Sequence, residues 1–131
     1  ALFLTAVLGG NMSVYYGDEL GMEGADDPDN RRAMAWGQIN KSWYSFYTKL
    51  IRLKREELNE CKIMHISLQD ALTITLSNST GNKLLAVVSP VDQPVLFEVA
   101  TNCEFLFGKA DVTAVGTEVR GFALFQVSAE E

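Results

Sequence analysis

The chain has 131 residues, of which 47% are hydrophobic and 21% are charged, and this composition predicts a globular protein with a buried core. Its 11 Lys and Arg residues and 17 Asp and Glu residues give a net charge of −6. This acidic balance argues against nucleic acid and anionic lipid as partners, because both require clustered positive charge, whereas neutral saccharides remain compatible.

The first 17 residues carry no charge, but they do not predict a membrane span. Gly9 and Gly10 interrupt the apolar run before it reaches spanning length, and no basic segment precedes it. Residues 1–8 are apolar nearly all round, which predicts the end of a buried helix. Residues 13–16 are β-prone and predict a short strand that is buried on both faces.

Two dense polar motifs follow. Residues 15–22 read Tyr-Tyr-Gly-Asp-Glu-Leu-Gly-Met, and after a short spacer residues 27–36 read Asp-Pro-Asp-Asn-Arg-Arg-Ala-Met-Ala-Trp. Their order and spacing resemble the last strand and the last βα loop of the α-amylase family, glycoside hydrolase family 13. The resemblance implies a loop at the sugar-binding mouth of a (β/α)8 barrel, and it implies that the catalytic carboxylates lie upstream of this point.

The rest of the chain divides into one helix and a series of strands. Asn40 can cap a helix over residues 41–57, whose apolar positions recur mostly every three or four residues, as in the closing helix of such a barrel. From Cys61 onward the period changes to two, and turn signals recur every eight to twelve residues. At least six short strands are expected, among them residues 72–77, 84–88, 95–99, 103–107 and 122–127, which indicates an antiparallel β-sandwich.

The expected fold class is therefore mainly β, with a C-terminal antiparallel β-sandwich after a remnant of a (β/α)8 barrel. Residues 1–59 form the expected barrel remnant, with a helix end, the last strand, the sugar-side loop and the closing helix. Residues 60–131 form the expected sandwich domain. Since residues 1–16 would lack their barrel neighbours, we expect this apolar segment to be disordered or to self-associate with another copy.

Asp18 and Glu19 are adjacent carboxylates, and glycoside hydrolysis uses two such groups. Neighbours on a strand point to opposite sides, so this pair cannot flank one glycosidic bond. We predict no catalytic residue in this chain. Instead, Tyr16, Gly17, Asp18 and Glu19 are expected to have a structural role at the strand end, with the carboxylates pairing with barrel arginines.

Asp27 and Arg31 are the predicted substrate-binding residues. In the neopullulanase and cyclomaltodextrinase branch that the loop resembles, the matching Asp and Arg hydrogen-bond glucose units on the non-reducing side of the cleaved bond. Vicinal sugar hydroxyls suit a fixed acceptor beside a planar donor fork. The alternative is an Asp–Arg salt bridge that only shapes the loop, with Asp29 and Arg32 taking part.

Structural roles are predicted for the remaining residues that could bind sugar or metal. Tyr15 and Tyr16 are expected in the core, and packing is favoured over sugar stacking for Trp36. His65 stands without Cys or His at metal-ligand spacing, and the acidic loop lacks calcium-loop spacing, so no metal and no cofactor are expected. Two cysteines do not make a disulfide framework, which favours reduced thiols and a cytoplasmic location, with an extracellular one as the alternative.

The sequence leaves three functions open. The leading one is the C-terminal portion of an enzyme that hydrolyses or transfers α-glucan oligosaccharides, retaining by resemblance, with this portion inactive alone. The second is a non-catalytic carbohydrate-binding or structural β-sandwich. The third is the tail of a catalytically dead amylase-like ectodomain, against which the intact Asp-Pro-Asp-Asn-Arg loop argues.

Overall fold

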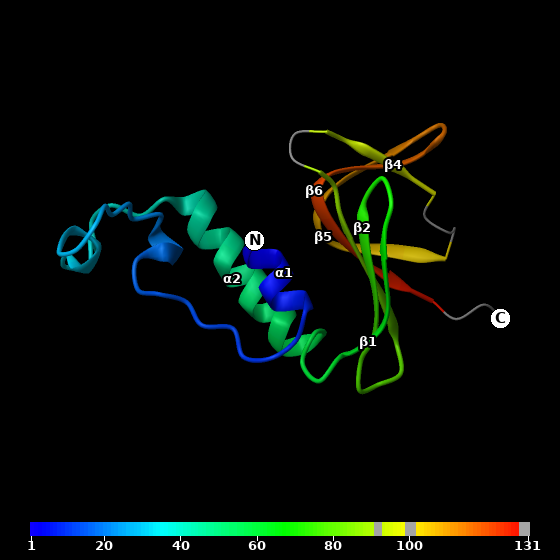
Figure 1. Ribbon diagram of the computed structural model, residues 1–131, viewed down its shortest axis with the longest axis horizontal. Helices are drawn as coiled ribbons and strands as arrows, with labels where there is room; N and C mark the ends of the chain where they lie inside the picture. Colours follow the sequence, from blue (N-terminus) through cyan, green and yellow to red (C-terminus); the bar gives the residue numbers. More distant parts are fainter. Residues whose placement is uncertain (91–92, 99–101, 129–131) are drawn as a thin grey trace.

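A computed structural model describes residues 1–90, 93–98 and 102–128. An extended loop occupies one end of the molecule, two helices lie in the middle and a β-sheet forms the other end (Figure 1). In chain order the elements are α1 (Leu2–Val7), the short 3-10 turns η1 (Asp18–Leu20) and η2 (Asp29–Arg31), α2 (Lys41–Glu56), β1 (Lys62–Leu68), β2 (Leu72–Ser77), β3 (Lys83–Val88), β4 (Val95–Phe97), β5 (Cys103–Thr113) and β6 (Gly116–Val127).

The helix predicted over residues 41–57 is confirmed as α2, which ends one residue earlier, at Glu56. Asn40 caps it as predicted, because its Oδ1 accepts a hydrogen bond from the Trp43 backbone N–H at 3.1 Å. Lys54 lies in the last turn, and its Nζ donates to the Ala6 carbonyl of α1 at 3.0 Å. This bond places a cation near the C-terminal end of α1 and ties the two helices together.

All strand pairs in the described part of the chain are antiparallel, and they form one connected sheet. The order is β1-β2-β3-β6-β4, and β5 pairs with β6 as well. The C-terminal half of β6 pairs with β3 and its N-terminal half with β4, so this strand joins the two parts of the sheet. The mainly antiparallel β character is confirmed, although the described strands do not separate into two sheets.

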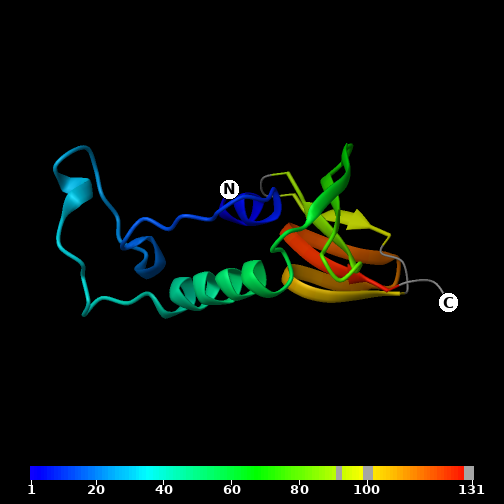
Figure 2. The ribbon, with the colours of Figure 1, turned by 90° about the horizontal axis from the view of Figure 1, so that it is seen from below.

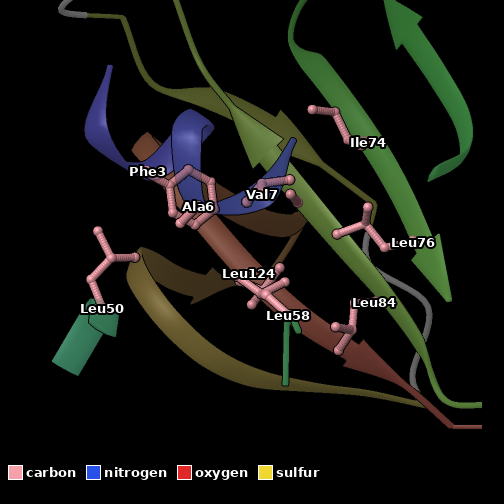
Figure 3. Close-up of a cluster of buried hydrophobic side chains, with 10 residues drawn as sticks. Phe3, Ala6, Val7, Leu50, Leu58, Ile74, Leu76, Leu84 and Leu124 are labelled. Atoms are coloured by element: carbon pink, nitrogen blue, oxygen red, sulfur yellow. The ribbon is translucent and has the colours of Figure 1, made fainter. Parts of the chain in front are cut away.

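The sheet has an apolar core on each face. One face carries Ile74, Leu76, Leu84 and Leu124, which pack with buried side chains of α1 and α2 (Figure 3). The other face carries a second cluster made by Ala71, Val87, Val119, Ala123 and Phe125. The helices therefore cover one face, and the curled sheet covers much of the other with its own residues.

Disorder, one of the two outcomes expected for residues 1–16, is wrong for residues 2–7, which form α1, whereas self-association of this segment stays a prediction. Phe3 is only 3% exposed, and Ala6 and Val7 are buried beside it. The ring of Phe3 stacks on Phe122 of β6 with centroids 4.5 Å apart. The physical reason is that the sheet of this chain offers α1 an apolar face, so burial does not require the barrel.

The strand predicted over residues 13–16 is also absent from the structure. A strand is stabilised by hydrogen bonds to a neighbouring strand, and the described residues supply no partner at this position. The core position expected for the two tyrosines is wrong for the same reason, since Tyr15 is 53% and Tyr16 43% exposed. None of the described helices has the length and apolarity needed to cross a membrane.

Candidate functional site

The first polar motif folds into a tight turn that is anchored on α2. Gly17 and Gly21 flank η1 with φ angles of 94° and 74°, in the left-handed region that favours glycine. Between them Leu20 is 4% exposed, and its carbonyl accepts a hydrogen bond from the Asn40 N–H at 3.2 Å. The start of α2 thus fixes the position of the motif.

Asp18 and Glu19 lie in this turn and do not face each other across a cleft. Glu19 Oε2 accepts a hydrogen bond from the Gly17 backbone N–H at 3.0 Å, so this carboxylate closes its own turn. Burial raises the pKa of Tyr47 on α2, and the charges of Asp18 and Glu19 raise it further. No ion pair within the described residues joins either carboxylate to an arginine.

Asp27 and Arg31 meet in a two-pronged ion pair. Arg31 Nε donates to Asp27 Oδ1 at 2.6 Å, and Arg31 Nη2 donates to Asp27 Oδ2. The bond to Asp27 raises the pKa of Arg31. Their side chains stay 65% exposed for Arg31 and 57% exposed for Asp27, so solvent reaches both. The sequence analysis named these two residues as one candidate site, and in the structure their side chains are in direct contact.

A second ion pair, Asp29–Arg32, holds the middle of the loop. Asp29 Oδ2 accepts from the Ala25 N–H at 3.0 Å and from Arg32 Nη2, and Arg32 Nε donates to the Asp29 carbonyl at 3.1 Å. The Ala25 N–H, followed by Arg32, lowers the pKa of the Asp29 carboxyl. This network fixes the shape of the loop independently of Asp27.

The two motifs touch through Tyr16, whose hydroxyl donates to the Arg32 carbonyl at 3.0 Å. The rings of Tyr15 and Tyr16 lie 4.8 Å apart. A cavity of about 140 Å3 lies here, lined by both tyrosines together with Asp18, Met22, Glu23, Gly24, Asp29, Asn30 and Arg32. Asp27 and Arg31 are outside this lining. The sequence did not predict that Asn30 and Arg32 line a cavity, because this cavity depends on how the two motifs fold back on each other.

Other residues singled out from the sequence lie apart from the loop. His65 is exposed on β1, and no group of three or more His, Cys, Asp or Glu side chains suited to a metal gathers in the part of the chain described. Trp36 is 75% exposed, so the packing role predicted for it is wrong. Cys61 Sγ donates to the Glu57 carbonyl at 3.1 Å, and burial raises the pKa of this thiol.

A larger groove of about 530 Å3 lies between α2 and β5, away from the loop. Its walls are mainly the aromatic and aliphatic side chains of Phe46, Leu53, Phe105 and Phe107. It contains neither of the predicted sugar-binding residues.

Comparison with known proteins finds partial matches to several named relatives. The chain is 56% identical over 45 residues to a cyclomaltodextrinase of Thermoanaerobacter pseudethanolicus, a match that covers 33% of this chain and 8% of the relative. It is 51% identical over 47 residues to neopullulanase 2 of Thermoactinomyces vulgaris, which covers 34% of this chain and 8% of the relative. A maltogenic α-amylase of Bacillus acidopullulyticus is 30% identical over 111 residues, or 76% of this chain and 19% of the relative.

These partial matches confirm the resemblance to the α-amylase family, glycoside hydrolase family 13. The chain spans less than a fifth of the length of each of these three relatives. No family model and no solved structure matches the chain.

Proposed function

We propose that this chain is the C-terminal portion of an α-glucan-active glycoside hydrolase or transglycosylase. Residues 1–59 would be the end of the catalytic barrel and residues 60–131 its C-terminal β-sandwich domain. The names of the relatives, which include a cyclomaltodextrinase, a neopullulanase and a maltogenic α-amylase, support the substrate class. In the intact protein residues 13–16 would gain strand partners and form the last barrel strand.

Within that protein the loop would contribute substrate contacts and no chemistry. Asp18 and Glu19 are adjacent in one turn, and Glu19 is engaged by the Gly17 N–H. A retaining mechanism needs two carboxyl groups about 5 Å apart that face one glycosidic bond. We therefore expect this chain, incubated alone with starch, pullulan or cyclodextrins, to release no reducing sugar above buffer. Release that is abolished by Asp18→Asn or Glu19→Gln would contradict this role.

Asp27 and Arg31 carry the substrate contact in this proposal, and their exposed ion pair is the observation that supports it. The bond to Asp27 uses Arg31 Nε and one Nη2 hydrogen, so Nη1 can still donate to a sugar hydroxyl. Each Asp27 oxygen can also accept a further bond. The ion pair thus presents a donor and an acceptor side by side in a fixed geometry, which two neighbouring hydroxyls of a glucose unit would match.

The competing role for the same pair is to shape the loop, and the matched variants Arg31→Lys and Arg31→Ala separate the two. Lysine keeps the charge and can still pair with Asp27, but it lacks the planar fork. In the full-length protein we expect both variants to lower kcat/KM for maltooligosaccharides, by roughly ten- to a hundred-fold for alanine. If the lysine variant kept full kcat/KM while only alanine lost it, the loop-shaping role would be favoured.

A further inference from the structure

Strand β1 forms an uncovered edge of the sheet. Among the described residues it pairs only with β2, so one row of its backbone N–H and C=O groups faces away from the sheet. The β1–β2 hairpin projects from the body of the sheet (Figure 2). Natural sheets protect such edges, because an open edge pairs readily with a strand from another chain.

The side chains of this edge are mostly apolar and exposed. Ile63, Met64, Ile66 and Leu68 are 41%, 64%, 51% and 78% exposed. In the register of the hairpin Ile66 stands opposite Ile74 and Leu68 opposite Leu72, which pack in or against the helix-side core. That apolar face therefore continues onto β1 and ends there in solvent.

Another edge strand among the described residues, β5, is protected better. It carries Glu104, Lys109 and Asp111 and has two irregularities in its pairing with β6. Charges and bulges are the usual means of preventing edge pairing. Strand β1 contains no acidic residue and a single irregularity, between Ile63 and His65.

We propose that β1 pairs antiparallel with β1 of a second copy of this chain, with Ile66 on the two-fold axis. In this register Lys62 of each copy lies opposite Asp70 of the other, two residues beyond the end of β1, and Ile63 lies opposite Gln69. Met64 lies opposite Leu68 and His65 lies opposite Ser67. Lys62–Asp70 joins a cation to an anion, Ile66–Ile66 and Met64–Leu68 are apolar pairs, and His65–Ser67 is a polar pair, whereas Ile63–Gln69 is the one mixed pair. The edge is therefore largely complementary to itself. This complementarity favours a second copy over an unrelated strand, although each chain has a net charge of −6.

The two-fold axis would stand perpendicular to the sheet. Both helix layers would then lie on the same side, and the apolar strips of the two β1 strands would meet between them. Since the nine residues 62–70 of each copy make a small interface, the dimer is expected to be weak, with a dissociation constant in roughly the micromolar range or above. This proposal does not depend on the function of the loop.

Sedimentation velocity on the full chain over a range of concentrations provides the test. We expect a monomer–dimer equilibrium whose dissociation constant Ile66→Lys raises roughly tenfold or more, because a lysine on the axis meets its own copy. The matched control is Val112→Lys on β5, since Val112 is apolar and 89% exposed. Circular dichroism checks that each variant folds. A monomer at every concentration, or a dimer weakened by Val112→Lys and not by Ile66→Lys, would overturn the proposal.

A charge swap tests the register. Lys62→Glu places two carboxylates opposite each other, Asp70→Lys places two ammonium groups there, and each is expected to weaken the dimer roughly two- to fivefold. The double variant Lys62→Glu with Asp70→Lys restores opposite charges and should restore the dissociation constant. Additive weakening in the double variant would contradict this register and require a different interface.

Discussion

The sheet and its helices are stabilised by buried apolar side chains. The loop between α1 and α2 is instead stabilised by exposed ion pairs and by hydrogen bonds between residues close in sequence. Leu50, Ile74 and Leu124 are fully or almost fully buried and touch residues distant in sequence. In the loop, Asp27–Arg31 and Asp29–Arg32 join residues only four and three positions apart. Exposed ion pairs contribute little to stability, so the two regions should respond to mutation very differently.

This difference fits a division of labour. The buried core fixes the positions of helices α1 and α2, which flank the loop, and the exposed loop leaves polar groups available to a ligand. The link between the two regions is the start of α2, where Asn40 caps the helix and its N–H holds Leu20. Substitutions in the core, at the link and in the loop test the comparison.

The largest effect is expected in the core. Leu124 is 0% exposed, so Leu124→Ala removes buried apolar surface and leaves a cavity. We expect the free energy of unfolding to fall by about 2–5 kcal/mol. Leu68→Ala is the matched control, because Leu68 is 78% exposed, and its effect should stay within about 0.5 kcal/mol. Urea denaturation of dilute protein measures both, and equal losses would show that burial does not stabilise the sheet as described.

A second core prediction concerns the bend in the β5–β6 hairpin. Gly108 has a φ of +112°, and a Cβ atom there would lie 2.2 Å from the Phe122 carbonyl oxygen. Gly121 also has a positive φ, +79°, but its Cβ would meet nothing within 4 Å. Both alanine substitutions strain the backbone, and only Gly108→Ala adds a clash with backbone atoms. We expect it to cost about 1–3 kcal/mol more than Gly121→Ala in the same denaturation measurement.

At the link, Asn40→Ala should cost about 1 kcal/mol, because the Trp43 N–H loses its acceptor at the start of α2. Asn40→Asp keeps an acceptor and serves as the control. Thermal unfolding followed by circular dichroism measures the loss. If Asn40→Asp were as damaging as Asn40→Ala, the side-chain cap would not be what stabilises this helix end.

The sequence predicts the elements whose signals are local. Asn40 and the apolar period predict α2, and alternation predicts the strand over residues 72–77, since both patterns face a core within this chain. Strands β5 and β6 are longer than the runs 103–107 and 122–127 predicted for them, because irregular pairing around Gly108 interrupts the alternation. The predicted part of β4 beyond residue 98 lies outside the described residues.

The wrong predictions depend on partners that a sequence does not name. The strand at residues 13–16 needs a neighbouring strand, and the burial of Phe3 depends on a contact with Phe122, more than 100 positions away. In the loop, the spacing indicated that Asp27 and Arg31 could meet, because both lie in one short segment. It could not indicate how Tyr16 reaches the Arg32 carbonyl, which depends on the fold of two motifs against each other.

The smallest effect on global stability is expected for Asp29, in the middle of the loop. The Ala25 N–H and Arg32 lower the pKa of its carboxyl, so the folded loop favours the ionised form. The sign follows: this contribution is complete above the ordinary aspartate pKa of about 3.9, and it is lost as the pH falls through the lowered pKa. The Ala25 amide signal in NMR spectra should therefore titrate with a midpoint below 3.9.

Asp29→Asn should abolish this titration and leave the melting temperature of the sheet unchanged, because the side chain is exposed. A midpoint at or above the ordinary value would mean that Asp29 does not organise the loop. A fall in the melting temperature of the sheet would mean that the two regions are not as independent as their contacts indicate.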